Sequence, residues 1–550
     1  MLNKRRVCLR TIIVIFAILV GFIGLHMYNH LRIQSISYTG EWGRGVEIGS
    51  AGINHNPLIE GFEDNILTIT FDKKGQVNYS LVKSDGTLVK NGIAQIDGFN
   101  KNKIKDVYLI RNNLYYVKDS KLYKVSFNEN SMFSTPETLV GNIEGFNYEV
   151  IDDVVYIQAY NKDKIQLYSI DNNKLKLEET FKNIWNIKDI YLRELNGQRY
   201  MFIVNKVNEL SDEVLGGNLI DFKENNLKKV DKLEYLVNTY IGEIDIIPNE
   251  DKFFMVYPVM KILPGGQRSV TIEVKSMDAK KLNVVDATFI SDTNIADLND
   301  RIDVLLYNDG IRLFGSGLNT DNKYALKADI FMIDIDSSCN IKSTTYLSST
   351  EHYSKNPTIL DNDKGSYLAW LEIKDSGYRL MLNSTNEDFK RSSYTYTQQD
   401  YKNAFLKALV TPFYAIALTA IKGTVVLIFS ILVFIPAVFI IKKMDIKDDK
   451  KKFFIFLGVY IIYNLFTFKN MYYRGTGVEF IPDILKSNFM IYIVPIALNI
   501  LSAIVLFAYY RDKKYFNYLK YLVLFIGADI YFINLLYAPF SMMKIILGEL

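Results

Sequence analysis

A pattern of short apolar segments separated by polar turns recurs between residues 57 and 390, and this repeat constrains the fold more than any other feature of the chain. In DVYLIRNNLYYVKDSKLYKV (106–125), an apolar segment, an Asn-Asn turn and a Tyr-rich segment precede a polar turn and a third segment. The second segment of each copy begins near one of seven positions, spaced by about 40 to 58 residues. These positions are Ile66, Leu114, Val154, Tyr200, Phe253, Ile311 and Tyr367.

Repeats of about 40–50 residues built from several short strands are typical of β-propellers. One blade cannot bury both of its faces, so consecutive copies must pack around a ring. We therefore predict an all-β propeller over residues 57–390, with seven blades and with eight or six as the alternatives. The chain resembles the β-propeller superfamily in these blade-like repeats only. WD dipeptides and kelch double glycines are absent, and the chain resembles no named family.

The N-terminus combines basic residues with an apolar run. MLNKRRVCLR forms the predicted cytoplasmic N-terminus at 1–10, and the apolar residues 11–29 follow. About 18 uncharged residues cross a bilayer core of about 30 Å at about 1.5 Å per residue. Because no small-residue cleavage site follows, we predict an uncleaved signal anchor and then a juxtamembrane linker at 30–56.

Further apolar runs cluster after residue 400. We predict a four-helix transmembrane domain over 423–550, preceded at 391–422 by a linker and an interfacial or stalk helix. Only Lys422 and Gly423 separate that helix from the first run, too few residues for a hairpin, so one long continuous helix is the alternative. The four predicted spans are 423–441, 453–468, 488–510 and 519–540.

The basic residues of the short loops predict the orientation. KKMDIKDDKKK, after the second span, holds six lysines, and RDKKYFNYLK, after the fourth, holds four basic residues. With the N-terminus inside, five crossings place both loops in the cytoplasm, and the large domain and the C-terminus outside. We thus expect a multi-pass cell-membrane protein with an extracytoplasmic domain. The abundance of Lys, Asn and Ile resembles proteins of AT-rich Gram-positive bacteria.

The chain carries no recognisable catalytic or cofactor motif. Its net charge is +3 over 550 residues, and it has no Walker A loop, zinc-finger spacing or basic helix, so we expect no nucleic-acid partner. The four histidines do not stand at metal-ligand spacing, so we expect neither a metal nor a cofactor and assign no catalytic residue. Catalysis by carboxylates from separate blades stays open, although we favour a protein without enzymatic activity.

Three polar residues in different spans fall at one predicted depth. Asp529, Asn464 and Asn499 lie about 15–18 Å from the cytoplasmic helix ends at about 1.5 Å per residue. An exposed carboxylate there costs at least about 2.5 kcal/mol, so Asp529 should face the other helices. Three interpretations remain: hydrogen bonding around a neutral Asp529, a path for a proton, ion or substrate, or a site for a basic residue of another membrane protein.

A short sequence pattern, here called the sequence echo, occurs twice, once in the N-terminal and once in the C-terminal part of the chain. GRGVEI at 43–48 and GTGVEF at 475–480 share the pattern G-x-G-V-E-apolar. Either the match is a coincidence or both segments form one surface that docks the ring onto the helices. The candidate docking residues are Arg44, Glu47, Arg474, Gly475, Gly477 and Glu479.

Together these features predict an integral membrane protein that presents an extracytoplasmic propeller as a module for ligand or partner binding, or for assembly. The expected partners are membrane lipid and an envelope or membrane protein. A first alternative is a sensor or transport-system component in which the propeller gates the helices. A second is an envelope-active enzyme with a site in the propeller channel.

Overall fold

The computed structural model divides the chain into a helical unit and a β-rich unit. The helical unit comprises Met1–Ile36, Lys323–Ala325 and Tyr396–Leu550, and the β-rich unit comprises Ser37–Asn322 and Leu326–Thr395. The structure describes residues 2–34, 40–128, 132–171, 174–208, 211–221, 226–234, 239–279, 284–291, 295, 297–319, 327–348, 352–374, 377–472, 481, 485, 487, 489–510 and 516–541.

In the β-rich unit, six antiparallel sheets are each continuous in sequence. The first is β2 (Leu58–Phe62), β3 (Asn65–Phe71), β4 (Val77–Lys83) and β5 (Leu88–Ala94), and a short 3₁₀ helix, η1 (Lys101–Lys103), follows it. The second is β6 (Val107–Ile110), β7 (Asn113–Lys118), β8 (Lys121–Asn128), β9 (Met132–Phe133) and β10 (Glu137–Gly141). The third is β11 (Gly145–Ile151), β12 (Val154–Tyr160), β13 (Lys164–Asp171) and β14 (Lys174–Lys182).

The other three continuous sheets follow the same order. The fourth is β15 (Ile187–Leu195), β16 (Gln198–Asn208), β17 (Ser211–Asp221) and β18 (Asn226–Glu234). The fifth is β19 (Thr239–Ile241), β20 (Asp245–Asn249), β21 (Lys252–Ile262), β22 (Arg268–Asp278) and β23 (Val284–Ile290). The sixth is β24 (Asp303–Tyr307), β25 (Gly310–Leu318), β26 (Ala328–Ile335) and β27 (Ile341–Tyr346).

A further sheet is assembled from both ends of the unit. It contains β28 (Ser354–Asn362), β29 (Gly365–Lys374) and β30 (Gly377–Ser384), and its fourth strand is β1 (Val46–Ala51), which pairs antiparallel with β30. The prediction of seven complete copies within 57–390 is therefore corrected. Six blades are continuous, and the last copy supplies three strands and takes its fourth from residues 30–56, the predicted linker.

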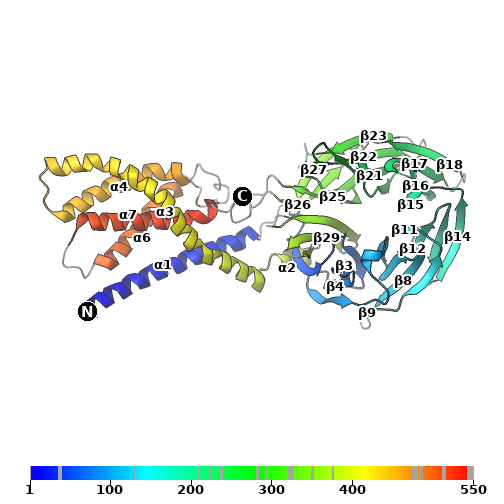
Figure 1. Ribbon diagram of the computed structural model, residues 1–550, viewed down its shortest axis with the longest axis horizontal. Coiled ribbons are helices and arrows are strands. Elements are labelled where there is room, and N and C mark those ends of the chain that lie inside the picture. Colours follow the sequence, from blue (N-terminus) through cyan, green and yellow to red (C-terminus); the bar gives the residue numbers. More distant parts are fainter. Residues whose placement is uncertain are drawn as a thin grey trace. The chain divides into compact units, whose positions relative to one another are not determined.

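The sheets are arranged around a ring. An inner-edge strand of one sheet contacts that of the next, as between β2 and β28, β15 and β20, β20 and β24, and β24 and β28. In the fifth sheet, β19 and β20 both pair with β21 and share the inner edge. These inner-edge strands therefore line the centre, and the later strands lie progressively further out (Figure 1). The unit is a β-propeller.

Local sequence explains the hairpins of each blade. Asp152 and Asp153 both have positive φ, at 47° and 59°, as do Arg111 and Asn112 at 45° and 64°. Two consecutive residues with positive φ form the type I′ turn, whose twist matches that of the flanking strands. Asn and Asp tolerate this backbone better than most residues, which explains the Asp-Asp pair. In the second blade the turn is Arg111-Asn112, one residue earlier than the predicted Asn-Asn turn, and Asn113 begins β7.

The segment before β1 packs tightly where the ring closes. A Cβ added to Gly45 would lie 2.5 Å from Cη2 of Trp370, and one added to Gly43 would lie 2.9 Å from Oγ of Ser393. Trp42 is buried and meets Phe314 edge-on, with ring centroids 5.8 Å apart. The glycines of GRGVEI are thus required by close packing within the ring.

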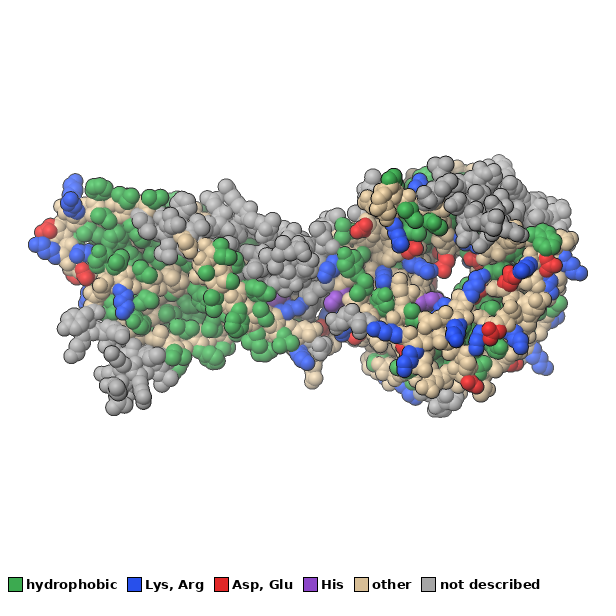
Figure 2. All heavy atoms as spheres, viewed as in Figure 1, with side chains coloured by type: hydrophobic (Ala, Val, Ile, Leu, Met, Phe, Trp, Pro, Cys, Tyr) green, Lys and Arg blue, Asp and Glu red, His purple; other side chains and the backbone are tan. Residues whose placement is uncertain are grey.

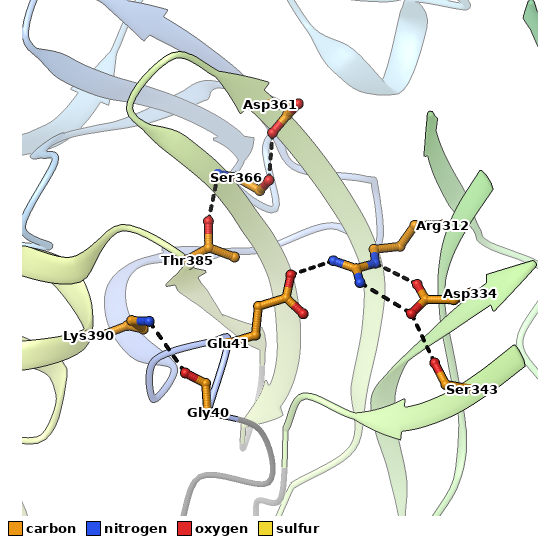
Figure 3. A network of polar contacts seen from close by, with 9 residues as sticks. All are labelled: Gly40, Glu41, Arg312, Asp334, Ser343, Asp361, Ser366, Thr385 and Lys390. Atoms are coloured by element: carbon orange, nitrogen blue, oxygen red, sulfur yellow. Dashed lines mark hydrogen bonds and ion pairs between the residues drawn. The ribbon is translucent and has the colours of Figure 1, made fainter. Parts of the chain in front are cut away.

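A buried arginine ties the same segment to the sixth blade (Figure 3). Nε of Arg312 donates to Oδ1 of Asp334 at 2.6 Å, and Nη2 donates to Oδ2 at 3.2 Å. Nη1 donates to Glu41 at 2.6 Å, and the guanidinium lies 3.5 Å from the centre of the Tyr307 ring. Ser343 donates to Asp334 at 2.9 Å. The guanidinium therefore joins two strands of the sixth blade to the segment that leads into β1.

A short helix secures the segment from the other side. α2 (Glu387–Ser393) begins after Asn386, whose side chain accepts from the N–H groups of the first turn. Lys390 donates to the carbonyl oxygen of Gly40 at 3.4 Å, and the backbone N–H of Arg44 donates to Ser393 at 3.0 Å. The residues that follow β30 thus hold the residues that precede β1.

The helical unit contains five long helices in the described part of the chain: α1 (Leu2–Gln34), α3 (Gln398–Lys443), α4 (Asp449–Tyr472), α6 (Met490–Tyr510) and α7 (Tyr518–Ser541). Each holds a stretch long and apolar enough to cross a bilayer. The predicted stalk helix within 391–422 and the predicted span 423–441 form one continuous helix, α3, which begins with a capping box between Thr397 and Asp400. α7 contacts α1, α3, α4 and α6 and is the central helix.

Replacing Gly45 with Ala should destabilise the ring by about 1–3 kcal/mol, because the added methyl group overpacks against Trp370. Gly40→Ala is the matched control, since a Cβ there meets no atom within 4 Å. All three tryptophans, Trp42, Trp185 and Trp370, lie in the β-rich unit, so tryptophan fluorescence during denaturant unfolding reports on the ring. Equal midpoints for the two variants would contradict the packing argument.

Replacing Arg312 with Ala should cost about 3 kcal/mol, because it leaves Asp334 without its charged partner in a partly buried site. Arg312→Lys should recover only part of the loss, since an ammonium cannot reproduce the two-pronged contact. Arg391→Ala is the control, because Arg391 is exposed and its ion pair with Asp388 lies at the surface. Thermal unfolding that shows no difference between Arg312→Ala and this control would refute the role assigned to the network.

Candidate functional sites in the channel and the helical unit

Polar residues recur where the inner strands begin. Three of them hydrogen-bond to the backbone of their own strand. The side-chain oxygens of Asn147, Asp189 and Asp303 each accept from the backbone N–H of the next residue, at 2.8 to 2.9 Å. The same short motif, an Asx residue followed by an apolar or aromatic one, recurs in five blades. Its members are Asp106, Asn147, Asp189, Asp245 and Asp303.

Several of these side chains also reach the neighbouring blade. Nδ2 of Asn147 donates to the carbonyl oxygen of Ile190 at 2.9 Å, and Oδ2 of Asp303 accepts from the backbone N–H of Ile359 at 2.8 Å. The motif therefore links adjacent inner strands around the centre of the ring. The polar side chains of the motif therefore stabilise the ring through hydrogen bonds, independently of any ligand.

The carboxylates of this motif experience a strongly perturbed environment. Desolvation raises the pKa of Asp189 to about 6, against the opposing effect of a hydrogen bond from Tyr191. Desolvation also raises the pKa of Asp303 to about 7, although it accepts from two backbone N–H groups. The pKa of Asp245 is raised well above its usual value, first by desolvation and then by the charges of Asp303 and Glu243.

Asp245 differs from its counterparts in its hydrogen bonding. Asp189 and Asp303 have partners as described, whereas the Asp245 carboxylate has none among the residues that the structure describes. It is partly exposed, as are Asp189 and Asp303, which fits positions on the channel wall. Asp245 and Asp303 thus combine partial exposure with mutual repulsion.

Basic residues occupy the segments that lead into the inner strands. Arg301 pairs with Glu243 at 3.0 Å, and Nζ of Lys188 donates to the carbonyl oxygen of Ile241 at 3.1 Å. Nζ of Lys105 donates to the hydroxyl of Tyr160 at 3.2 Å. Figure 2 shows an opening through the ring with acidic and basic side chains around it. Cations are therefore held at the entrance by protein acceptors, and carboxylates follow along the wall.

The entrance provides charge but no recognisable catalytic set. No group of three or more His, Cys, Asp or Glu residues in the described ranges could hold a metal ion. His55 meets the Phe71 ring edge-on and hydrogen-bonds to the carbonyl oxygen of Asn56 through Nδ1. Burial and then the charge of Lys101 lower the pKa of His55 to about 4, so it is neutral at neutral pH. The arrangement suits binding of a charged group.

In the helical unit, the structure brings two of the three predicted polar residues together. Asp529 on α7 is fully buried, and its Oδ2 accepts from Nδ2 of Asn464 on α4 at 2.8 Å. The hydroxyl of Tyr460, also on α4, donates to the same oxygen at 2.9 Å. Ser502 on α6 lies 3.5 Å from Oδ1.

Asn499 is buried on α6, but it does not hydrogen-bond to Asp529. Its Nδ2 donates to the carbonyl oxygen of Pro495 at 2.6 Å, and its Oδ1 has no partner in the structure. Sequence reasoning missed Tyr460 and Ser502. The available signal was spacing, because Tyr460 lies one helical turn from Asn464 and Ser502 lies three residues from Asn499.

The two halves of the sequence echo have separate outcomes. Arg44 and Glu47 belong to the closure of the ring: the N–H of Arg44 donates to Ser393, and Glu47 lies 3.6 Å from Arg379. The other candidates lie outside the described residues: Arg474, Gly475, Gly477 and Glu479.

Comparisons with known proteins found only distant structural similarity. No family model and no curated protein matches the chain. The WD40 domain of Toxoplasma gondii coronin aligns with 14% identity and a TM-score of 0.38, covering 63% of this chain and 84% of that one. The WD40 domain of SCAP from fission yeast aligns with 11% identity and a TM-score of 0.33, covering 64% of this chain and 100% of that one. The polysaccharide lyase Uly1 aligns with 10% identity and a TM-score of 0.41, covering 64% of this chain and 94% of that one. At these values the likeness carries no conclusion about function.

Asp245→Asn should stabilise the ring at pH 8, because the amide carries no charge for desolvation and neighbouring carboxylates to disfavour. The pKa of Asp245 is raised in the folded ring, so the folded state binds the proton more strongly than the unfolded state. The free energy of unfolding therefore falls as pH rises from about 4 through the folded-state pKa. Because the introduced amide does not titrate, Asp245→Asn should not lose free energy of unfolding as pH rises, and at pH 4 it should be no more stable than the unmodified protein.

Tryptophan fluorescence during unfolding at both pH values measures this effect on the full chain in detergent. Asp119→Asn is the control, because Asp119 is exposed and its positive φ of 48° suits Asn equally well. If Asp245→Asn stabilised the ring equally at pH 4 and pH 8, titration of the carboxyl group would not be the cause.

Proposed function

We propose that the protein is an integral membrane protein that presents its propeller outside the cytoplasm as a binding module. The propeller lies in the chain between one apolar helix and four more, each long enough to cross a bilayer. The lysine-rich connection between α3 and α4 and the basic connection between α6 and α7 support a cytoplasmic position for both loops. The large domain is then extracytoplasmic.

The way the ring closes supports a tethered binding module. β1 pairs with β30, and α2 contacts the residues before β1, so both connections to the helices leave the ring at one blade. The ring is therefore tethered in sequence through the residues that precede β1 and those that follow β30.

The perturbed carboxylates of the channel are the observation that carries the proposal. Asp245 and Asp303 lie on adjacent blades, are partly exposed, and have raised pKa values. A cationic group in the channel relieves their repulsion and favours their ionised forms. We infer that the ligand presents an amine, or a Lys or Arg side chain, to this wall.

Peptide binding to the full chain in nanodiscs tests the proposal. A fluorescent oligolysine peptide should bind in a salt-sensitive manner, and an oligoglutamate peptide of equal length should not. Asp245→Asn should weaken oligolysine binding at least tenfold, about 1.4 kcal/mol, because a wall carboxylate is lost without loss of a hydrogen bond. Fluorescence anisotropy gives the affinities.

Asp119→Asn removes one acidic charge from an exposed turn of the same ring and controls for net charge. Its affinity for oligolysine should equal that of the unmodified protein. Equal losses in the two variants, or equal binding of both peptides, would refute recognition of a cationic group in the channel.

A further inference from the structure

The central helix of the helical unit carries polar side chains that are fully buried. α7 packs against α1, α3, α4 and α6, and both Asp529 and Asn534 on it are 0% exposed. Polar groups with no access to water must find partners within the protein. The partners of Asp529 therefore indicate its chemical state.

The two oxygens of Asp529 have different surroundings. Oδ2 accepts from Tyr460 and Asn464 at 2.9 and 2.8 Å, which satisfies it. Oδ1 has only the hydroxyl of Ser502, at 3.5 Å. That hydroxyl also lies 2.9 Å from the carbonyl oxygen of Leu498, to which it donates. Oδ1 therefore has no well-placed donor.

No charged group compensates for an ionised Asp529. In the part of the chain that the structure describes, no basic side chain pairs with its carboxyl group, and all of its partners are neutral hydrogen-bonding groups. Among the described side chains, Tyr460 on α4 donates to Asp529, and His26 on α1 hydrogen-bonds to α7 at Leu535. An unpaired carboxylate at the centre of a bilayer costs at least about 2.5 kcal/mol.

α6 supplies acceptors where a donor on Asp529 is needed. Oδ1 of Asn499 is buried and without a partner, and Asn499 lies three residues before Ser502, on the same side of the helix. Unpaired acceptors on α6 and an unpaired oxygen on α7 do not complement each other. A proton on Oδ1 of Asp529 turns that oxygen into a donor toward α6 and leaves Oδ2 as the acceptor from α4.

We propose that Asp529 is a proton-binding site of the helical unit. The carboxylate takes up one proton on Oδ1 to become a neutral carboxylic acid. Tyr460 and Asn464 hold Oδ2, and the hydroxyl oxygen of Ser502 is the acceptor beside the proton on Oδ1. This site lies in the helical unit and does not depend on the proposed ligand of the channel.

Buried polar groups continue from this site toward the C-terminal end of α7. Nδ2 of Asn534 donates to Thr419 on α3 at 3.1 Å, and Nε2 of His26 hydrogen-bonds to the carbonyl oxygen of Leu535 at 2.8 Å. Aromatic and aliphatic side chains enclose both halves of α7, so these polar groups are individual contacts within an apolar core.

Infrared spectroscopy of the full chain in nanodiscs tests the proposal. At pH 7, the difference spectrum between the unmodified protein and Asp529→Asn should contain the carbonyl band of one protonated carboxyl group. Tyr460→Phe should retain the band and shift it to higher frequency, because one hydrogen bond to Oδ2 is lost. Asp445→Asn, at an exposed position on the cytoplasmic-side loop with a positive φ of 46°, should leave it unchanged.

Two outcomes would overturn the proposal. Absence of the band at pH 7 would show that Asp529 is ionised. Loss of the band on addition of sodium chloride at constant pH, but not of a salt with a bulky organic cation, would show that a metal cation occupies the site. If Asp529→Asn fails to elute as a single species in size-exclusion chromatography, the proposal is tested instead by the frequency shift of the carbonyl band in Tyr460→Phe. An unshifted spectrum in that variant would then refute the assignment.

Discussion

The pairing of β1 with β30 is the constraint on which the propeller depends. An isolated blade cannot bury both of its faces, so the last blade must pack against the first, and a strand shared between the two ends of the unit fixes that contact. Here the N-terminal segment completes it, and Trp42, two glycines and the ion pair between Glu41 and Arg312 hold that segment in place. Once the ring is closed, the first strands of the blades line a common channel. The channel carboxylates owe their positions to this closure.

The same side chains serve structure and electrostatics in the channel. Asp303 and Asn147 link neighbouring inner strands through backbone groups, and this linkage explains why Asx residues recur in the repeat. Carboxylates held in such positions are poorly solvated and repel one another, so their protonated forms are favoured. Asp245 has this environment without a compensating hydrogen bond, which makes it the informative residue for distinguishing ligand binding from structural linkage. In the helical unit, Asp529 is also poorly solvated. Its Oδ2 accepts from Tyr460 and Asn464 on α4, and its Oδ1 lies 3.5 Å from the hydroxyl of Ser502 on α6.

Much of the architecture could be predicted because it is encoded locally. The Asp-Asp turn, the spacing of the apolar segments and the long apolar runs are each encoded within short stretches of sequence, and they predicted both units. The counting of helix depth also placed Asn464 beside Asp529. The completion of the last blade by β1 was not predicted, because the residues in contact there, such as Arg44 and Ser393, are 349 positions apart. Nothing in GRGVEI distinguishes a linker from a segment that leads into a strand. Tyr460 and Ser502 were missed because depth alone does not say which side of each helix faces α7.

The sequence by itself determined that short strands repeat, that five apolar helices frame them, and that a carboxyl group lies within the last helix. These are consequences of local periodicity and of the cost of exposing apolar or polar groups to the wrong environment. Only the tertiary structure decided that the final blade borrows β1, that Gly43 and Gly45 are required by contacts with Ser393 and Trp370, and that Asn499 is directed to its own helix. Such outcomes depend on contacts between residues far apart in the chain, and their geometry exists only once the ring and the helices have packed.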